Sequence, residues 1–291
     1  MKTISIVGTG LIGGSAALDL RKTGNVRELI GVDQNPEHAA RAVELGLVDR
    51  ILPLQEAAAV SDVLLVAIPV SAIQKLLPSL LDMLPPQAVV IDLGSTKSLL
   101  CEAVRQHPNR AQFVAAHPIA GTEYSGPTAA LEGLYQGKMN IICEKELSSE
   151  HALHTAQEVF STLGLKTIYM QPEEHDKHVA YVSHLSHVSS FLLGLTVLDV
   201  EKDERNIFTL AGSGFASTVR LAKSSPDMWA PIFEQNAHFL SHALAEYIKH
   251  LQRFQECLQS GQTQELYQMM QQANQIRPVL DGIAQVSPVV K

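Results

Sequence analysis

Hydrophobic residues in the first part of the chain gather in short, continuous runs with little polar alternation. The clearest runs are Thr3–Val7, Leu29–Val32, Val63–Ile68, Ala88–Asp92 and Phe113–Ala116. Strands that are buried on both faces show this pattern, because helices cover both sides of a parallel sheet. The runs therefore predict the strands of a parallel sheet.

Helix-length segments separate these runs. They are Leu11–Lys22, Pro36–Leu45 and Val70–Leu84. Two later strands, Met139–Cys143 and Lys166–Tyr169, flank a further helix that either Ser148 or Ser149 is suited to cap. Strands that alternate with helices indicate an α/β fold, here a Rossmann-type, doubly wound sheet.

The strand signal disappears after Pro172. From there to about Ile283 the chain is apolar-periodic and rich in Leu, Ala, Gln and His, which indicates helices. We therefore expect two domains, an α/β domain over residues 1–171 and an all-helical domain over residues 172–291. A length of 291 residues is consistent with two domains.

Composition and charge exclude several classes of partner. The residues are 46% hydrophobic and 18% charged, as in a globular protein, and the net charge of −8 opposes broad binding to nucleic acid or anionic membranes. The longest apolar runs that we identify are strand-sized, too short to span a bilayer. The three cysteines are far apart and form no CxxC pair, which suits a reducing compartment. We expect a cytoplasmic protein.

The segment Gly8-Thr-Gly-Leu-Ile-Gly13 has the GxGxxG spacing of a dinucleotide-binding turn. It follows a predicted strand and opens a predicted helix, whose N-terminal N–H groups favour a pyrophosphate. The next strand ends at Asp33, 20 residues after Gly13. A carboxylate there accepts hydrogen bonds from the ribose hydroxyls and repels a 2′-phosphate, which favours NAD over NADP.

Three more segments follow predicted strands, at the edge where such sheets bind ligands. They are Ile68-Pro69, Asp92–Lys97 and His117–Thr122. His117 places an imidazole at a strand end, and the oxidation of an alcohol needs a proton acceptor, because the hydroxyl loses its proton as hydride leaves the carbon. The cofactor-binding residues that we expect are Gly8, Gly10, Leu11, Ile12, Gly13, Asp33, Ile68, Pro69 and Gly94.

Four segments resemble the prephenate/arogenate dehydrogenases of tyrosine biosynthesis. They are Asp92–Lys97 (DLGSTK), His117–Gly126 (HPIAGTEYSG), Val182–His187 (VSHLSH) and Gly214–Ala222 (GFASTVRLA). Together with the glycine turn they follow in order over about residues 1–280. The HPIAGTE-type and SHLxH-type segments are specific to that family, whereas GxGxxG is shared widely.

The resemblance implies oxidative decarboxylation of prephenate with NAD, giving 4-hydroxyphenylpyruvate, CO2 and NADH. It implies that His117 takes the proton of the ring hydroxyl, that Ser95 hydrogen-bonds to His117, and that Arg220 binds a substrate carboxylate. Further pocket-lining positions match Thr122, Ser183 and His187. A homodimer paired through the helical half is also implied, and the long apolar helices favour it.

Three alternatives stay open. In the first alternative, the same chemistry acts on arogenate, which differs from prephenate by an ammonium in place of a keto group. No residue in the sequence decides between the two substrates. The β-hydroxyacid dehydrogenases share a Rossmann half and a helical half, but their GxxGxGxxxK pattern is absent from the sequence. A non-catalytic NAD-sensing module would bind NAD without turnover.

Two further features refine the expected site. On one continuous helix, four histidines point in directions too different to hold one ion, so we expect no metal site. They are His175, His178, His184 and His187. The chain also departs from the family after Gly214-Phe215, where many members carry a basic and an acidic residue and this sequence has the neutral pair Ala216 and Ser217.

Overall fold

The computed structural model describes residues 1–203 and 206–286, and its centre is an eight-stranded sheet with the order β3-β2-β1-β4-β5-β6-β7-β8. The first six strands are parallel, β7 runs antiparallel to β6, and β8 is parallel to β7. The strands are β1 (Lys2–Val7), β2 (Val26–Val32), β3 (Arg50–Ile51), β4 (Val63–Val66), β5 (Val89–Asp92), β6 (Phe113–Pro118), β7 (Met139–Cys143) and β8 (Lys166–Met170).

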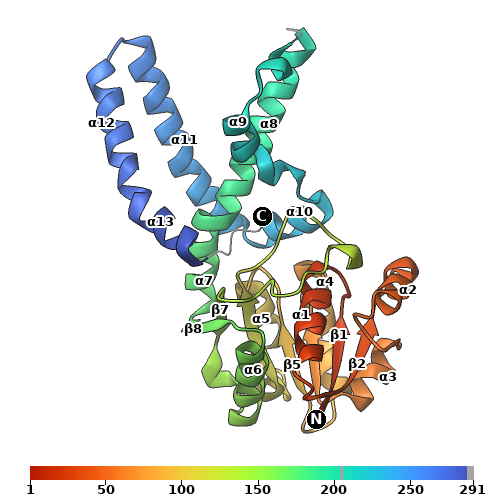
Figure 1. Cartoon of the computed structure of the whole chain (residues 1–291). Helices are drawn as coiled ribbons and strands as arrows, with labels where there is room; N and C mark the ends of the chain where they lie inside the picture. The colour runs from red at the N-terminus through yellow and green to blue at the C-terminus, as the bar shows by residue number, and fades with distance from the viewer. Residues whose placement is uncertain (204–205, 287–291) are drawn as a thin grey trace. The chain divides into compact units, whose positions relative to one another are not determined.

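Helices cover both faces of this sheet, as the unbroken apolar strands predict (Figure 1). One face packs against α1 (Leu11–Lys22), α2 (Pro36–Glu44) and α6 (Glu150–Thr162). The other face packs against α3 (Leu54–Val60), α4 (Val70–Met83) and α5 (Ser98–Val104). The expected Rossmann-type, doubly wound fold is confirmed.

Local sequence signals place most of these elements well. The helix predicted at Leu11–Lys22 has the same bounds in the structure, and the predicted strands after residue 138 are present as β7 and β8. Ser149 caps α6 by accepting a hydrogen bond from the Ala152 amide, whereas the Ser148 hydroxyl donates to the Phe113 carbonyl. The sequence does not predict the short elements β3, α3 and α5, because a strand of two residues and helices of seven are too short to show a clear hydrophobic period.

Beyond Met170 the described residues form helices and no strand, as expected for the second half. These are α7 (Pro172–Val179), the π-helical turn η4 (Ala180–His184), α8 (Leu185–Asp203), α9 (Ser213–Val219), the 3-10 turn η6 (Arg220–Lys223), α10 (Pro226–Gln235), α11 (Ala237–Gln259), α12 (Thr263–Ala273) and α13 (Arg277–Val286). By contacts the chain divides into two compact units, Met1–Ala237 and His238–Lys291. Helices α7 to α10 thus belong to the same unit as the sheet, and the domain boundary that we place at 171/172 stays a prediction.

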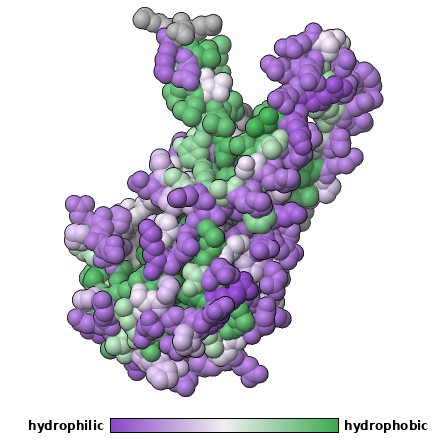
Figure 2. Space-filling model, turned by 180° about the vertical axis from the view of Figure 1, so that it is seen from behind, coloured by the Kyte–Doolittle hydropathy of each residue, from purple (hydrophilic) through white to green (hydrophobic). Residues whose placement is uncertain are grey.

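One continuous helical stretch, residues 172–202, is long and apolar enough to cross a membrane by length and composition alone. We expected only strand-sized apolar runs, because serines and histidines interrupt this stretch in the sequence. Only 11% of its most apolar window is buried. Figure 2 shows hydrophobic side chains gathered along the arm that α8 forms. The exposed ones include Leu192, Leu193, Leu195, Leu198 and Val200.

Candidate active site

The candidate site lies at the edge where β1, β2, β4, β5 and β6 end. The sheet order reverses direction between β1 and β4, which is the point where ligands bind in folds of this kind. The antiparallel β7 begins at this edge, since Asn140 near its start pairs with Pro118 at the end of β6. The segments after these strand ends carry most of the side chains predicted for the site.

The glycine turn after β1 has no room for side chains at two positions. Gly8 has φ +95°, and a Cβ there would lie 2.7 Å from the carbonyl oxygen of Ala67. A Cβ on Gly13 would lie 2.0 Å from the carbonyl oxygen of Gly8, so α1 packs against the turn with no intervening atom. Gly10 caps α1 in an extended conformation. The unpaired N–H groups of this helix end therefore open directly onto the turn.

Asp33 follows β2 and points back toward the glycine turn. Its Oδ2 accepts hydrogen bonds from the backbone amide of Thr9 at 3.0 Å and from the Thr9 hydroxyl at 2.8 Å. Its Oδ1 accepts from the Asn35 amide at 3.0 Å. These bonds fix the carboxylate at the place where a dinucleotide fold binds the ribose hydroxyls.

The remaining predicted cofactor-binding residues lie at the same edge of the sheet. Ile68 contacts the turn, because its Cγ2 lies 2.8 Å from the position of a Cβ on Gly8, and Pro69 caps α4. Leu11 and Ile12 form the first turn of α1, and the Ile12 carbonyl accepts a 2.6 Å hydrogen bond from the buried Tyr135 hydroxyl. Gly94 follows β5 and donates its amide to Asp92 at 3.0 Å.

A buried ion pair holds the backbone before His117 in place. Asp92, at the end of β5, is bonded to Lys97, and both side chains are fully buried. The Ala116 amide donates to Asp92 Oδ1 at 3.0 Å, and Lys97 Nζ donates to the Ala116 carbonyl at 2.8 Å. The side chains of Asp92 and Lys97 thus hold both the amide and the carbonyl group of Ala116. We call this arrangement the Asp92–Lys97 clamp.

His117 contacts a second histidine that the sequence interpretation did not place in the site. Nδ1 of His117 lies 2.8 Å from Nε2 of His175, and Nδ1 of His175 lies 2.8 Å from Oδ1 of Asp176. Burial lowers the pKa of His117 well below its usual range, and the neighbouring His175 and Lys97 lower it further. His117 is therefore a neutral base at pH 7.

The residues expected to bind the acid end of the substrate form a second group. Arg220 Nη1 donates to Glu123 Oε2 at 2.9 Å, which joins η6 to the loop after His117. His187 stacks on Trp229 with ring centroids 3.4 Å apart, and its Nδ1 lies 3.1 Å from the Ser183 carbonyl. Burial lowers the pKa of His187, and the charge of Arg220 lowers it as well. Arg220 and His187 therefore share one electrostatic environment.

Four other residues singled out in the sequence are less closely connected to these groups. The Thr122 hydroxyl accepts from the Tyr124 amide at 3.2 Å within the loop after His117. Ser95 follows β5 and is partly buried, and the described residues include no hydrogen bond between it and His117, whose ring is bonded to His175 instead. Ala216 and Ser217 are exposed on α9. The roles of these residues stay predictions.

The loop between β6 and β7 crosses the glycine turn. A Cβ on Gly10 would lie 3.9 Å from the Gly126 amide nitrogen, and Gly126 itself has φ +80°. Beyond it, the Leu131 amide donates to Ser15 on α1 at 2.9 Å. The loop that carries Glu123 is therefore anchored beside the dinucleotide turn.

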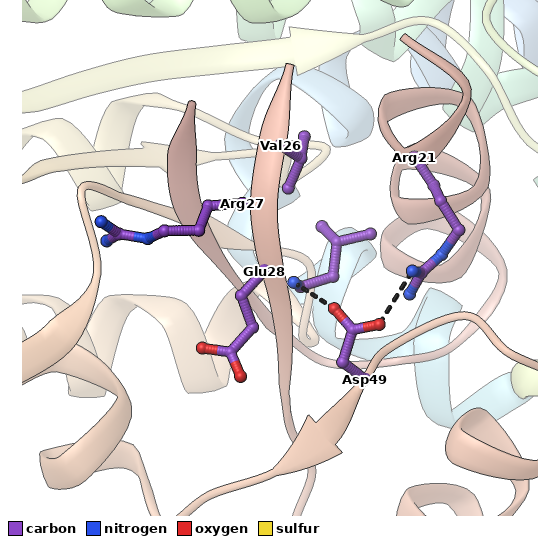
Figure 3. A pocket seen from close by; sticks show the side chains of 6 residues that line it. Arg21, Val26, Arg27, Glu28 and Asp49 are labelled. Atoms are coloured by element: carbon purple, nitrogen blue, oxygen red, sulfur yellow. Dashed lines mark hydrogen bonds and ion pairs between the residues drawn. The ribbon is translucent and has the colours of Figure 1, made fainter. Parts of the chain in front are cut away.

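Two further observations concern metal ligands and a hollow in the surface. No cluster of three or more His, Cys, Asp or Glu side chains suited to a metal occurs among residues 1–203 and 206–286. A hollow of about 380 Å³ lies at the opposite edge of the sheet, beside the start of β2 (Figure 3). Its charges are paired, because Arg21 bonds to Asp49 at 2.8 Å and Arg27 lies 3.6 Å from Asp62.

Comparison with known families gives a consistent result over nearly the whole chain. Residues 16–169 match the family described as prephenate dehydrogenase, nucleotide-binding domain. Residues 171–272 match the family described as prephenate dehydrogenase, dimerization domain. The two matches meet where the strands end and the helices of the second half begin.

Individual relatives agree with these matches. The prephenate dehydrogenase of Bacillus subtilis is 29% identical over 97% of this chain and 76% of its own length. The cyclohexadienyl dehydrogenase of Zymomonas mobilis is 27% identical over 99% of both chains.

The fold agrees as well. The crystal structure of prephenate dehydrogenase from Aquifex aeolicus in complex with hydroxyphenyl propionate and NAD+ has a TM-score of 0.88 and 32% identity, covering 96% of this chain and 98% of that one. The Synechocystis arogenate dehydrogenase has a TM-score of 0.75 and 30% identity, covering 96% and 99%.

Proposed function

The chain belongs to the prephenate dehydrogenase family, and on that premise we propose that it oxidises and decarboxylates prephenate to 4-hydroxyphenylpyruvate with NAD. The observation that carries the proposal is the position of His117. This imidazole is kept neutral by burial and stands at the carboxyl end of β6, on the sheet edge that bears the dinucleotide turn. A proton acceptor beside a dinucleotide site is what the oxidation of a ring hydroxyl requires.

The residues of the glycine turn fit NAD. A pyrophosphate needs close access to backbone, and the turn is closed to side chains at Gly8 and Gly13. The carboxylate of Asp33 suits a free 2′-hydroxyl and opposes a 2′-phosphate, so NAD rather than NADP fits the site. When bound, NAD supplies the acceptor for the hydride that leaves C4 of the substrate ring.

His117 handles the proton in this scheme. As hydride leaves C4, the C4 hydroxyl gives its proton to Nε2 of His117, and a carbonyl forms at C4. The ring carboxylate then leaves as CO2, its bonding electrons complete the aromatic ring, and the resulting phenolate oxygen takes up a proton. The net result is one hydride transferred and one CO2 released, and the proton that His117 takes from the hydroxyl balances the proton that the phenolate oxygen takes up.

Arg220 is the cation that we assign to a substrate carboxylate. A guanidinium matches a carboxylate with two parallel hydrogen bonds, and such charged bonds contribute about 1.5–3 kcal/mol each. With a net charge of −8 on the chain, a local cation is needed to hold a dianionic substrate. Thr122, Ser183 and His187 lie on the segments around Arg220 and are proposed to line the same pocket.

We further propose a homodimer in the cytoplasm. The family matched by residues 171–272 is described by its dimerization, and α8 in that region exposes a row of leucines. A second copy of the chain is the partner that we assign to this surface. Cys101, Cys143 and Cys257 are all free and buried, which suits a reducing compartment. Analytical ultracentrifugation at micromolar concentration tests the dimer, and a monomer would contradict it.

The decisive experiment follows NADH formation with prephenate and then arogenate as sole substrate. The structural similarity to the Synechocystis arogenate dehydrogenase makes arogenate the second candidate. Turnover of prephenate supports the proposal, and turnover of arogenate alone reassigns the substrate within the same chemistry. NAD binding with no turnover of either compound would instead indicate a sensing module.

A further inference from the structure

We infer that Asp176 and His175 act as positioning residues that leave the proton-accepting lone pair of His117 on Nε2. The inference rests on the proposed function, in which His117 is the base. Three side chains form an unbroken line from Asp176 through His175 to His117, with 2.8 Å at each step. Because every member is held by its neighbour, the position of each ring proton follows from the one before it.

The line begins at Asp176, which can only accept hydrogen bonds when ionised. The Lys97 amide donates to its Oδ1 and the Ser98 amide to its Oδ2, each at 2.8 Å, so the carboxylate caps the start of α5. Burial raises the pKa of Asp176, but its hydrogen bonds to His175 and Ser98 outweigh this effect and leave the pKa lowered. Asp176 is therefore an anion that presents an acceptor to Nδ1 of His175.

The carboxylate of Asp176 determines which nitrogen of His175 carries hydrogen, and His175 does the same for His117. It is fully buried, and burial lowers its pKa despite the neighbouring Asp176, so the ring is neutral and carries one N–H. That hydrogen is on Nδ1, where the carboxylate accepts it, and Nε2 keeps a lone pair. The 2.8 Å contact then requires a hydrogen on Nδ1 of His117, which leaves Nε2 of His117 as the acceptor. If His175 carried its hydrogen on Nε2 instead, that N–H would face the N–H on Nδ1 of His117, and the two groups could not form a hydrogen bond.

The line of side chains also supplies a negative charge that stabilises His117 once it is protonated. Lys97 from the start of α5 and His184 from η4 both disfavour a charged His117. Asp92 is nearby but is bonded to Lys97, so Asp176 is the anion connected to His117 through hydrogen bonds. When His117 accepts the substrate proton, it becomes a cation, and Asp176 stabilises that cation through His175.

A set of four variants tests the assignment by steady-state kinetics. Asp176→Asn removes the anion, and His175→Leu removes the bridge, whereas His175→Gln keeps a donor and an acceptor in one side chain. His178→Gln is the matched control, because His178 is exposed on the same helix. We expect kcat to fall at least about tenfold in Asp176→Asn and His175→Leu, with KM values within roughly twofold, and to recover in part in His175→Gln.

The pH profile separates positioning from a general loss of structure. Loss of the Asp176 charge makes the protonated form of His117 less stable, so the acid limb of kcat moves to lower pH in Asp176→Asn. His178→Gln leaves both the plateau and the limb unchanged. Wild-type kcat and an unmoved limb in Asp176→Asn, or equal kcat in His175→Leu and His175→Gln, would overturn the inference.

A readout that needs no turnover keeps the test independent of the proposed function. The 15N chemical shifts of His117 report which ring nitrogen carries hydrogen, and we expect Nδ1–H in the wild type and loss of that preference in His175→Leu. If the wild type turns over neither substrate, the proposed function fails while the shifts still decide the inference. If His117→Asn is inactive and the wild-type shifts show Nε2–H, the function stands and the inference fails.

Discussion

The carboxylate of Glu123 accepts a 2.9 Å hydrogen bond from the guanidinium of Arg220, the side chain that we assign to the substrate. Glu123 is held in the loop after His117, with 14% of its side chain exposed, whereas 52% of Arg220 is exposed. A substrate carboxylate must therefore share or replace this partner when it binds. The ion pair connects the loop after His117 with η6, which carries Arg220.

Replacing Arg220 with Ala is expected to raise KM for prephenate by about tenfold or more and to leave KM for NAD unchanged. The reason is that a charged hydrogen bond of about 1.5–3 kcal/mol is lost from the substrate alone. Steady-state kinetics with each ligand varied in turn measures both constants. An unchanged KM for prephenate would remove the role assigned to Arg220.

Replacing Glu123 with Gln removes the competing carboxylate and is expected to lower KM for prephenate. Half-exposed ion pairs contribute about 0.2–1 kcal/mol, so the decrease is at most about fivefold. The same kinetic assay measures it, with Glu132→Gln as a control because that glutamate pairs with Lys22 on α1. A higher KM in Glu123→Gln would show that Glu123 orients Arg220 rather than competing for it.

His117→Asn is expected to lower kcat by at least about a hundredfold, because a positioned general base contributes ~10²–10⁴-fold. Asn keeps a polar group at the end of β6 but cannot take a proton at neutral pH. NADH formation at saturating substrate measures kcat, and binding of NAD by fluorescence checks that the fold is retained. Near-normal turnover would contradict the proposed mechanism.

Gly13→Ala is expected to lower the free energy of unfolding by about 1–3 kcal/mol and to weaken NAD binding. The added Cβ would lie 2.0 Å from the Gly8 carbonyl oxygen, so α1 must move away from the turn. Urea unfolding and NAD titration measure the two effects. Gly282→Ala is the control, since a Cβ there meets nothing within 4 Å. Equal NAD affinity in both variants would contradict the close-packing argument.

Stability is expected to fall as the pH falls below about 6.5. Burial lowers the pKa of His184 to about 4 in the folded protein, and on unfolding the ring regains an ordinary pKa of about 6.5. The unfolded state then binds the extra proton, so the folded state loses about 1.4 kcal/mol at about pH 5.5 relative to about pH 8. Burial also lowers the pKa of His117 and His175, which act in the same direction.

Urea unfolding at the two pH values measures this dependence. His178→Asn should keep the full difference, because His178 is exposed, whereas His184→Asn should reduce it. A free energy of unfolding that is equal or larger at about pH 5.5 would contradict the assignment of buried, neutral histidines.

Local patterns were sufficient for the sheet and the dinucleotide turn. A run such as Val63–Val66 is apolar because both faces of the strand are covered, and this information lies within four residues. The spacing of Gly8, Gly10 and Gly13 is equally local. The doubly wound order then follows from general rules of connection rather than from any particular residue.

The partners of the site residues could not be found in this way. His175 lies 58 positions after His117 in the chain, and only folding brings the two rings together. The available signal is the adjacent pair His175-Asp176, which begins five residues after β8 ends, but our interpretation tests that histidine only as a metal ligand and rejects it. Glu123 lies within the segment His117–Gly126, but its bond to Arg220 spans 97 positions. Pairings over such separations depend on tertiary packing.

The Asp92–Lys97 clamp has a consequence for how activity responds to heat. Because Asp92 and Lys97 hold Ala116 from both sides, the position of His117 is set when the sheet folds, and substrate binding has little left to organise there. The same bonds bury two opposite charges that depend on each other. We therefore expect that heating displaces His117 only when the domain itself unfolds, so that loss of activity and loss of the fold coincide.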